Sequence, residues 1–103
     1  MVAQGELWLM ETPAGQNRPA LVVTRDEAIP VLNSVLVAPV TSTIRDIPTC
    51  IPVGRSNGLH RPSVASFDTL AAVHKSLLKR RLGALPAGGH RQICEALRAA
   101  AAC

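Results

Sequence analysis

Two short runs of mostly branched apolar residues, at positions 20–23 and 35–40, restrict the fold of this chain more than any other feature. Each run has the length and composition of a buried strand. Arg18 stands directly before Pro19, and a proline disfavours helical geometry at the preceding residue, so we expect Arg18 to enter the first strand in an extended conformation. Pro39 has no N–H to donate to a neighbouring strand, which indicates an edge, a bulge or a bend in the second run.

Polar side chains lie at the ends of these two expected strands. Arg18 precedes the first strand, and Thr41 and Ser42 follow the second, beyond the expected interruption at Pro39. If the strands are neighbours in one sheet, the guanidinium and the two hydroxyls lie close together and can bind a phosphate through charge-assisted hydrogen bonds. Spacing alone favours a simpler interpretation, in which a surface arginine and two hydroxyls cap free backbone groups at the strand ends.

The chain resembles the MazF/PemK family of toxin endoribonucleases in five segments, which occur in the order typical of the family. The segments are GELW at 5–8, RPALVV at 18–23, VAPVTS at 37–42, SVASFDTL at 63–70 and LGAL at 82–85. They span nearly the whole chain, so the resemblance implies a single MazF/PemK-like toxin domain over residues 1–103. It also implies a mainly β fold, a small SH3-like barrel of the MazF, PemK and CcdB type with a C-terminal α-helix.

The resemblance further implies a biological role and a chemistry. It implies a growth-regulating toxin of a type II toxin–antitoxin system, an mRNA interferase that forms a homodimer and is inhibited by a cognate antitoxin protein. Its reaction would be sequence-specific, metal-independent cleavage of single-stranded RNA to 2′,3′-cyclic phosphate and 5′-hydroxyl ends. By the same resemblance the catalytic residues are Arg18, in the RP motif, and Thr41, near the end of the VAPVTS motif.

Further side chains are candidates for weaker contacts with RNA. Ser42 offers a second hydroxyl, two polar residues precede Arg18 in the first loop, and three basic residues lie later in the chain. These candidates are Ser42, Gln16, Asn17, Arg55, Arg61 and Lys79. The first loop is shorter than is usual in the family and lacks its acidic residue. His60 is a possible general base because a histidine titrates near neutral pH, but we interpret it as a surface residue of the loop 54–62.

The charge favours a polyanionic partner, while the composition and the motifs argue against a base-stacking platform and against a metal or cofactor site. Eleven Lys and Arg residues against seven Asp and Glu give a formal charge of +4, which suits nucleic acid. Trp8 and Phe67 are the only aromatic residues, too few for a base-stacking platform. The sequence contains no metal-ligand cluster, glycine-rich phosphate loop or Ser–His–Asp arrangement, so we expect neither a metal nor another cofactor.

The cysteines and the hydropathy indicate a cytoplasmic protein. Cys50, Cys94 and Cys103 are odd in number and widely spaced, which predicts neither a disulfide framework nor a zinc site. We expect Cys94 in the core and Cys103 as a free terminal thiol. The N-terminus lacks a signal-peptide pattern, and no apolar run approaches the roughly 20 residues that span a bilayer.

The other segments predict about six strands and one helix. A hairpin loop is expected over residues 13–17, a helical turn capped by Asp26 within 28–34, and an edge strand with Pro52 over 50–53. The basic segment HKSLLKRR suggests a helical turn with Lys75 and Lys79 on one side. After Gly88 and Gly89, helical periodicity places Ile93, Leu97 and Ala100 on one face.

Two other functions remain open on the sequence alone. The first is a non-enzymatic toxin of the CcdB type, which would act on DNA gyrase through protein contacts and would not need Arg18 beside Thr41. The second is an RNA-binding barrel that does not cleave, which would show salt-dependent affinity for RNA that stays intact. A cleavage assay separates both from an endoribonuclease.

Overall fold

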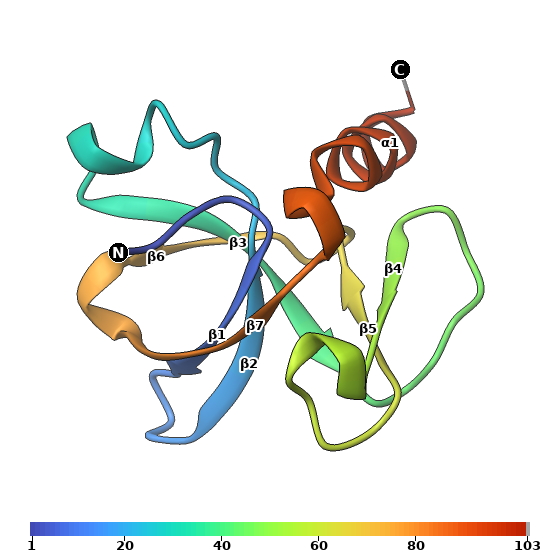
Figure 1. The fold of residues 1–103 in the computed structure, drawn as a ribbon, viewed down its shortest axis with the longest axis horizontal. Helices are drawn as coiled ribbons and strands as arrows, with labels where there is room; N and C mark the ends of the chain where they lie inside the picture. Colours follow the sequence, from blue (N-terminus) through green and yellow to red (C-terminus); the bar gives the residue numbers. More distant parts are fainter. Residues whose placement is uncertain (103) are drawn as a thin grey trace.

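A computed structural model describes residues 1–102, and a curled, antiparallel β-sheet dominates it (Figure 1). Cys103 lies outside the described residues. The strands are β1 (Glu6–Glu11), β2 (Asn17–Val22), β3 (Ser34–Thr41), β4 (Cys50–Val53), β5 (Ser63–Ser66), β6 (Ala71–His74) and β7 (Leu78–Ala84). The helices are α1 (His90–Ala101) and the short 3-10 turns η1 (Ile29–Val31), η2 (Arg55–Asn57), η3 (Lys75–Leu77) and η4 (Pro86–Gly89). The predicted mainly β fold with a C-terminal helix is confirmed.

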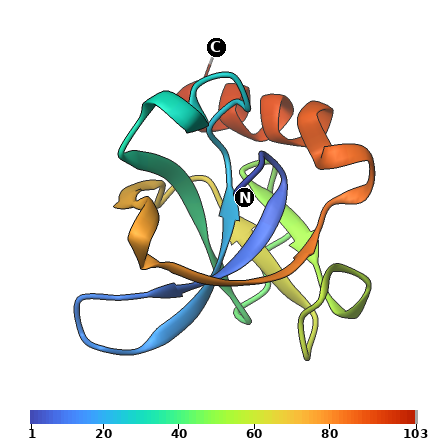
Figure 2. The same cartoon turned by 60° about the vertical axis from the view of Figure 1, so that its left-hand side comes forward.

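The sheet runs in the order β4-β5-β3-β2-β1-β7, and β6 pairs with the first half of β3. Its curl produces a half-barrel, and α1 lies at one end, opposite the β1–β2 loop, in both Figure 1 and Figure 2. The first hairpin has a five-residue loop, as predicted, but over residues 12–16 rather than 13–17, because β1 ends at Glu11 and β2 begins at Asn17. Among residues 1–102, no helix has the length and apolar character needed to cross a membrane.

Pro39 lies at the point where β3 changes partners along one of its sides. Residues 34–37 of β3 pair with β6, whereas Val40 and Thr41 pair with β5. The missing N–H of a proline is tolerated at such a break, so the predicted irregularity is real although β3 is a central strand. Thr41 lies beyond this break, as expected, but it is still the last residue of β3, where it pairs with Val64 of β5.

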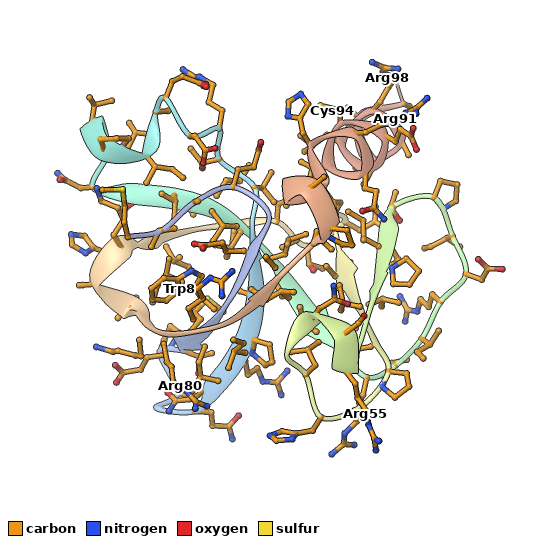
Figure 3. All side chains as sticks on the ribbon, viewed as in Figure 1. Trp8, Arg55, Arg80, Arg91, Cys94 and Arg98 are labelled. Atoms are coloured by element: carbon orange, nitrogen blue, oxygen red, sulfur yellow. The ribbon has the colours of Figure 1, made fainter. Side chains whose placement is uncertain are left out.

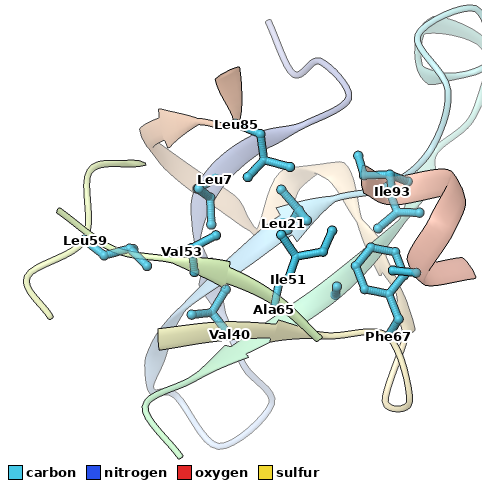
Figure 4. Close-up of a cluster of buried hydrophobic side chains, with 13 residues drawn as sticks. Leu7, Leu21, Val40, Ile51, Val53, Leu59, Ala65, Phe67, Leu85 and Ile93 are labelled. Carbon is cyan, nitrogen blue, oxygen red and sulfur yellow. The ribbon is translucent and has the colours of Figure 1, made fainter. Parts of the chain in front are cut away.

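The larger core cluster fills the half-barrel beneath α1 (Figure 4). Leu7, Leu21 and Ile93 are fully buried there, and burial of each such side chain contributes on the order of 1.5–3 kcal/mol. Ala96 is also buried, so the buried stripe of α1 runs through Ile93 and Ala96, while Ala100 is exposed. Cys94 is half-buried on the flank of this stripe, which corrects its expected place in the core.

Three local predictions differ from the structure. The turn η3 ends at Leu77 and β7 begins at Leu78, so Lys79 lies on a strand, because this segment pairs with β1. Asp26 does not cap η1; its carboxylate accepts a hydrogen bond from the backbone N–H of Gln4 at 2.7 Å. The short strand β6 was not predicted. Pro52 does lie on an edge strand, as expected.

Candidate active site

Arg18 and Thr41 each lie two residues beyond the last pair of the β2–β3 ladder, which is Ala20 with Pro39. The same antiparallel register, extended by two residues, would set Arg18 beside Thr41. Each residue is also fixed from its other side, since Arg18 pairs with Met10 of β1 and Thr41 pairs with Val64 of β5. The two residues are therefore held within the sheet rather than on free loop ends.

A cleft of about 450 Å³ opens beside this pair, and we call it the main cleft. Its apolar wall includes Leu9, Pro19, Val40, Leu59 and Leu82. Its polar and basic lining consists of Arg18, Thr41, Ser42, His60, Arg61, Ser63 and Arg80. Apolar surface beside several convergent cationic and hydroxyl groups is the composition expected of a site that binds an anionic organic ligand.

A second hollow of about 330 Å³ lies on the other side of the pair, and we call it the side hollow. It shares Arg18, Val40 and Thr41 with the main cleft. Its remaining lining includes hydroxyl groups and Asp68, whose Oδ2 accepts a hydrogen bond from Thr49 Oγ1 at 2.7 Å. Arg18 and Thr41 thus stand at the boundary between two adjacent hollows.

The functional groups of this pair are free to donate hydrogen bonds to a ligand. Thr41 Oγ1 accepts a hydrogen bond from the backbone N–H of Thr43 at 3.2 Å, which leaves the hydroxyl hydrogen available. Within the described part of the chain, the Arg18 guanidinium has no ion pair or hydrogen bond. A free cation and a free hydroxyl at facing strand positions can bind two oxygens of one phosphate.

Rigid contacts hold the loop that carries His60 and Arg61 against β7. Gly58 has φ +90°, and an added Cβ there would clash with the Leu82 carbonyl, while a Cβ on Gly83 would clash with the Asn57 carbonyl. The buried Asn57 side chain accepts from the Gly54 N–H at 2.9 Å and donates to the Ala84 carbonyl at 3.1 Å. This backbone contact, which only glycine permits, builds one wall of the main cleft.

The predicted substrate-binding residues fall into two groups. Ser42 and Arg61 line the main cleft together with Arg18 and Thr41, whereas Gln16, Asn17, Arg55 and Lys79 line neither hollow. Arg55 instead donates from Nε to the His60 carbonyl at 3.3 Å, and Lys79 Nζ lies 3.3 Å from Glu11 Oε2. Arg55 therefore supports the loop, and Lys79 joins β7 to β1.

Sequence reasoning did not single out Arg80, which lines the main cleft. On β7, Lys79 and Arg81 both form ion pairs with carboxylates of β1, while Arg80 lies between them on the opposite face. Figure 3 shows Arg80 and Arg55 in the same lower half of the molecule, away from α1. Strand alternation separates Arg80 from its neighbours, but the sequence predicts a helical turn over HKSLLKRR, which hides this alternation.

Glu6 forms an ionic group with three hydrogen-bond partners. Its Oε1 accepts hydrogen bonds from the Ala3 N–H at 2.8 Å and Trp8 Nε1 at 3.1 Å, and its Oε2 accepts from Arg81 Nε at 2.7 Å. Burial raises the pKa of Glu6, but the hydrogen bonds from Trp8, Arg81 and Ala3 outweigh burial and leave this pKa below its ordinary value. Among residues 1–102 no group of three or more His, Cys, Asp or Glu side chains is arranged to bind a metal.

Comparisons with known proteins identify the family. The chain is 40% identical over 80 residues to the endoribonuclease MazF3 of Mycobacterium tuberculosis, which covers 78% of each chain. It is 38% identical over 102 residues to the probable endoribonuclease MazF5 of the same organism, covering 98% of this chain and 94% of the relative. The solved structure of the M. tuberculosis toxin MazF-mt6 superimposes with a TM-score of 0.84 at 34% identity, over 94% of this chain and 96% of that one. A family model matches residues 3–101, and the protein therefore belongs to the PemK-like, MazF-like toxins of type II toxin–antitoxin systems.

Proposed function

We propose that this toxin is an endoribonuclease that cleaves single-stranded RNA at the Arg18–Thr41 pair. The observation that carries the proposal is the free guanidinium and the free hydroxyl at facing strand positions, between two hollows. The names of the relatives, endoribonuclease MazF3 and probable endoribonuclease MazF5, support the same activity. A phosphate bound at the boundary would direct the nucleotide before it and the nucleotide after it into different hollows.

The proposed chemistry uses a nucleophile from the substrate itself. The ribose 2′-hydroxyl attacks the adjacent phosphorus and gives up its proton to water, the bond to the 5′-oxygen breaks, and the leaving 5′-oxygen takes up a proton from water. The products carry a 2′,3′-cyclic phosphate and a 5′-hydroxyl. The transition state places additional negative charge on the non-bridging oxygens. The Arg18 guanidinium and the Thr41 hydroxyl stabilise this charge, and an electrostatic contribution of this kind amounts to several kcal/mol in a pre-organised site.

The role of Arg18 in this proposal is electrostatic. A guanidinium stays protonated in proteins and cannot act as a general base. The permanent positive charge of the Arg18 guanidinium takes the place that a metal ion would have at the phosphate, so the proposed reaction is independent of metal ions. Ser42, Arg61 and Arg80 line the main cleft and would contact the flanking phosphates and bases.

Family membership supports an antitoxin as a protein partner. A toxin of a type II system is paired with an antitoxin protein, and we propose that the antitoxin of this toxin inhibits cleavage by covering the two hollows. The expected homodimer and the expected cytoplasmic location stay predictions. Light scattering of the purified protein tests the first, and the cell fraction in which the expressed toxin is found tests the second.

The decisive experiment incubates the purified protein with long single-stranded RNA in EDTA and maps the new ends. We expect discrete cuts with 2′,3′-cyclic phosphate ends, lost by at least about a hundredfold in Arg18→Ala and in Thr41→Val. Arg25→Ala is the matched control, since Arg25 is exposed and lines neither hollow. RNA that stays intact with the parent protein contradicts the proposal and leaves the two alternatives, a toxin that acts on gyrase and a barrel that binds RNA without cleaving it. Equal cutting by the parent protein and Arg18→Ala would show that residues other than Arg18 catalyse the cleavage.

A further inference from the structure

A cysteine, a histidine and a glutamine form a continuous chain of contacts on one side of α1. Cys94 Sγ lies 3.5 Å from His90 Nε2, and His90 Nδ1 lies 3.2 Å from Gln4 Oε1. Cys94 and His90 are one helical turn apart on α1, and Gln4 comes from the segment before β1. No residue of α1 lines the main cleft or the side hollow, so the proposed RNA cleavage does not use this group.

The contacts of Gln4 determine which nitrogen of His90 carries the proton. Gln4 Nε2 donates to the Val23 carbonyl at 2.9 Å, and the backbone N–H of Gln4 donates to Asp26 Oδ1 at 2.7 Å. With its amide nitrogen fixed on a carbonyl, Gln4 presents an oxygen acceptor to His90, so His90 Nδ1 must be the N–H donor. In the neutral ring Nε2 is then an acceptor, and it faces the Cys94 thiol.

This arrangement has the three parts of an activated nucleophile. A thiol adjoins a basic nitrogen, and a third group orients the base through its other nitrogen. Cys94 is only half-buried, so a small reagent can approach its sulfur. A buried structural cysteine would be inert, whereas an accessible thiol beside a base reacts as the thiolate.

Two arginines flank Cys94 on the exposed side of the helix. Arg91 lies three residues before Cys94 and Arg98 four residues after it, which places both on its side of α1, and Figure 3 labels all three residues on this helix. Arg91 pairs with Glu95 at 3.4 Å. Within residues 1–102, Arg98 has no ion pair. The charge of Arg98 therefore favours a reagent that carries carboxylates.

We propose that Cys94 is a modification site, a thiol activated by His90 that forms mixed disulfides with small, carboxylate-bearing disulfides. His90 Nε2 takes the thiol proton, and the Cys94 sulfur attacks one sulfur of the incoming disulfide. A new S–S bond forms, the old one breaks, and the second sulfur leaves as a thiolate. The exchange uses no oxidant other than the disulfide itself, and reduction by an excess of free thiol reverses it.

The test measures the reactivity of Cys94 alone. In a Cys50→Ser/Cys103→Ser variant, the second-order rate of reaction with the dianionic reagent 5,5′-dithiobis(2-nitrobenzoate) is followed at pH 7 by the absorbance of the released thiolate. We expect the folded protein to react at least about tenfold faster than the same chain unfolded in urea. We expect His90→Ala to lose this acceleration, and Gln4→Met, which keeps the size of the side chain without its acceptor, to lose part of it.

Matched controls separate activation from unfolding and from access. His74→Ala should keep the parental rate, because His74 bonds to Ser76 instead. Circular dichroism should show every variant folded. Arg98→Gln should slow the dianionic reagent several-fold but leave the rate with neutral 2,2′-dithiodipyridine unchanged. A folded protein no faster than the unfolded chain, or a His90→Ala variant at the parental rate, overturns the proposal. Equal rates of Arg98→Gln and parent with both reagents overturn the preference for an anionic disulfide.

Discussion

Four basic side chains of this toxin form two sets with opposite surroundings. Lys79 and Arg81 project from one face of β7, and each pairs with a carboxylate of β1, Glu11 or Glu6. Arg18 and Arg80 line the main cleft, and within residues 1–102 neither has an ion pair. The first set joins two strands, whereas the second set leaves its charge available to a ligand.

This difference shows that position on a strand, rather than charge, decides the role of a basic residue. Residues 79, 80 and 81 are consecutive and all cationic, yet strand alternation sends the middle one to the opposite face from its neighbours. A carboxylate near Arg18 or Arg80 would neutralise the cleft and repel a phosphate. Among residues 1–102, no residue that lines the main cleft carries a carboxylate.

The largest expected effect comes from removing the wall of the cleft. Gly58→Ala and Gly83→Ala each introduce a Cβ that clashes with a backbone carbonyl of the opposite segment, so we expect a loss of about 3 kcal/mol or more in the free energy of unfolding. Urea denaturation measures it. Gly54→Ala is the control, since its Cβ would meet Pro62 at an ordinary 3.7 Å. Similar free energies of unfolding for all three variants would show that the loop and β7 can move apart without a loss of stability.

The next effect concerns the first set, in which Arg81 pairs with Glu6. Glu6→Gln weakens the hydrogen bonds from Arg81, Trp8 and Ala3, so we expect a loss of about 1–2 kcal/mol at pH 7, measured by urea unfolding. Because the pKa of Glu6 is lowered in the folded protein, its ionised carboxylate stabilises the fold at pH values above the ordinary pKa of glutamate. This stabilisation disappears as pH falls through the lowered pKa, so parent and variant should converge in strong acid. Glu27→Gln, at an exposed residue, is the control, and a gap that stays constant with pH would contradict this role.

A smaller effect separates the two sets by RNA affinity. Arg80→Gln should weaken binding of an uncleavable, 2′-deoxy-substituted RNA several-fold and reduce the slope of log affinity against log salt by about one. Arg81→Gln, one residue away, should leave both quantities at the parental value. Binding is measured by fluorescence anisotropy at several salt concentrations. Equal effects of the two substitutions would remove the distinction between the sets.

The smallest expected effect is that of Lys79→Gln. Its ion pair with Glu11 is exposed, with about half of each side chain accessible, and such pairs contribute under about 1 kcal/mol. We expect the free energy of unfolding, measured by thermal denaturation, to change by at most about 0.5 kcal/mol and the RNA affinity to stay constant. A marked loss of RNA affinity would restore Lys79 as a substrate contact, as the sequence first indicated.

The neighbouring positions of Arg18 and Thr41 were predictable from the sequence because they depend on nearby segments. Two apolar runs that pair in register bring the residues flanking them together, and Pro39 marked a real irregularity. Arg80 was not predictable in the same way. Its side of the sheet depends on the pairing of β7 with β1, some seventy residues away, and consecutive like charges hid the alternation. Strand β6 was missed because AAVH is too short and too rich in alanine to carry a strand signal.

The pairing of β1 with β7 determines when the main cleft can first form. The main cleft needs Leu9 from the first strand together with Arg80 and Leu82 from the last. A chain still attached to the ribosome cannot complete this ladder until β7 has left the exit tunnel. The cell therefore makes every residue through β7 before this cleft is assembled, and a truncated translation product that ends before residue 78 lacks the β7 wall of that cleft.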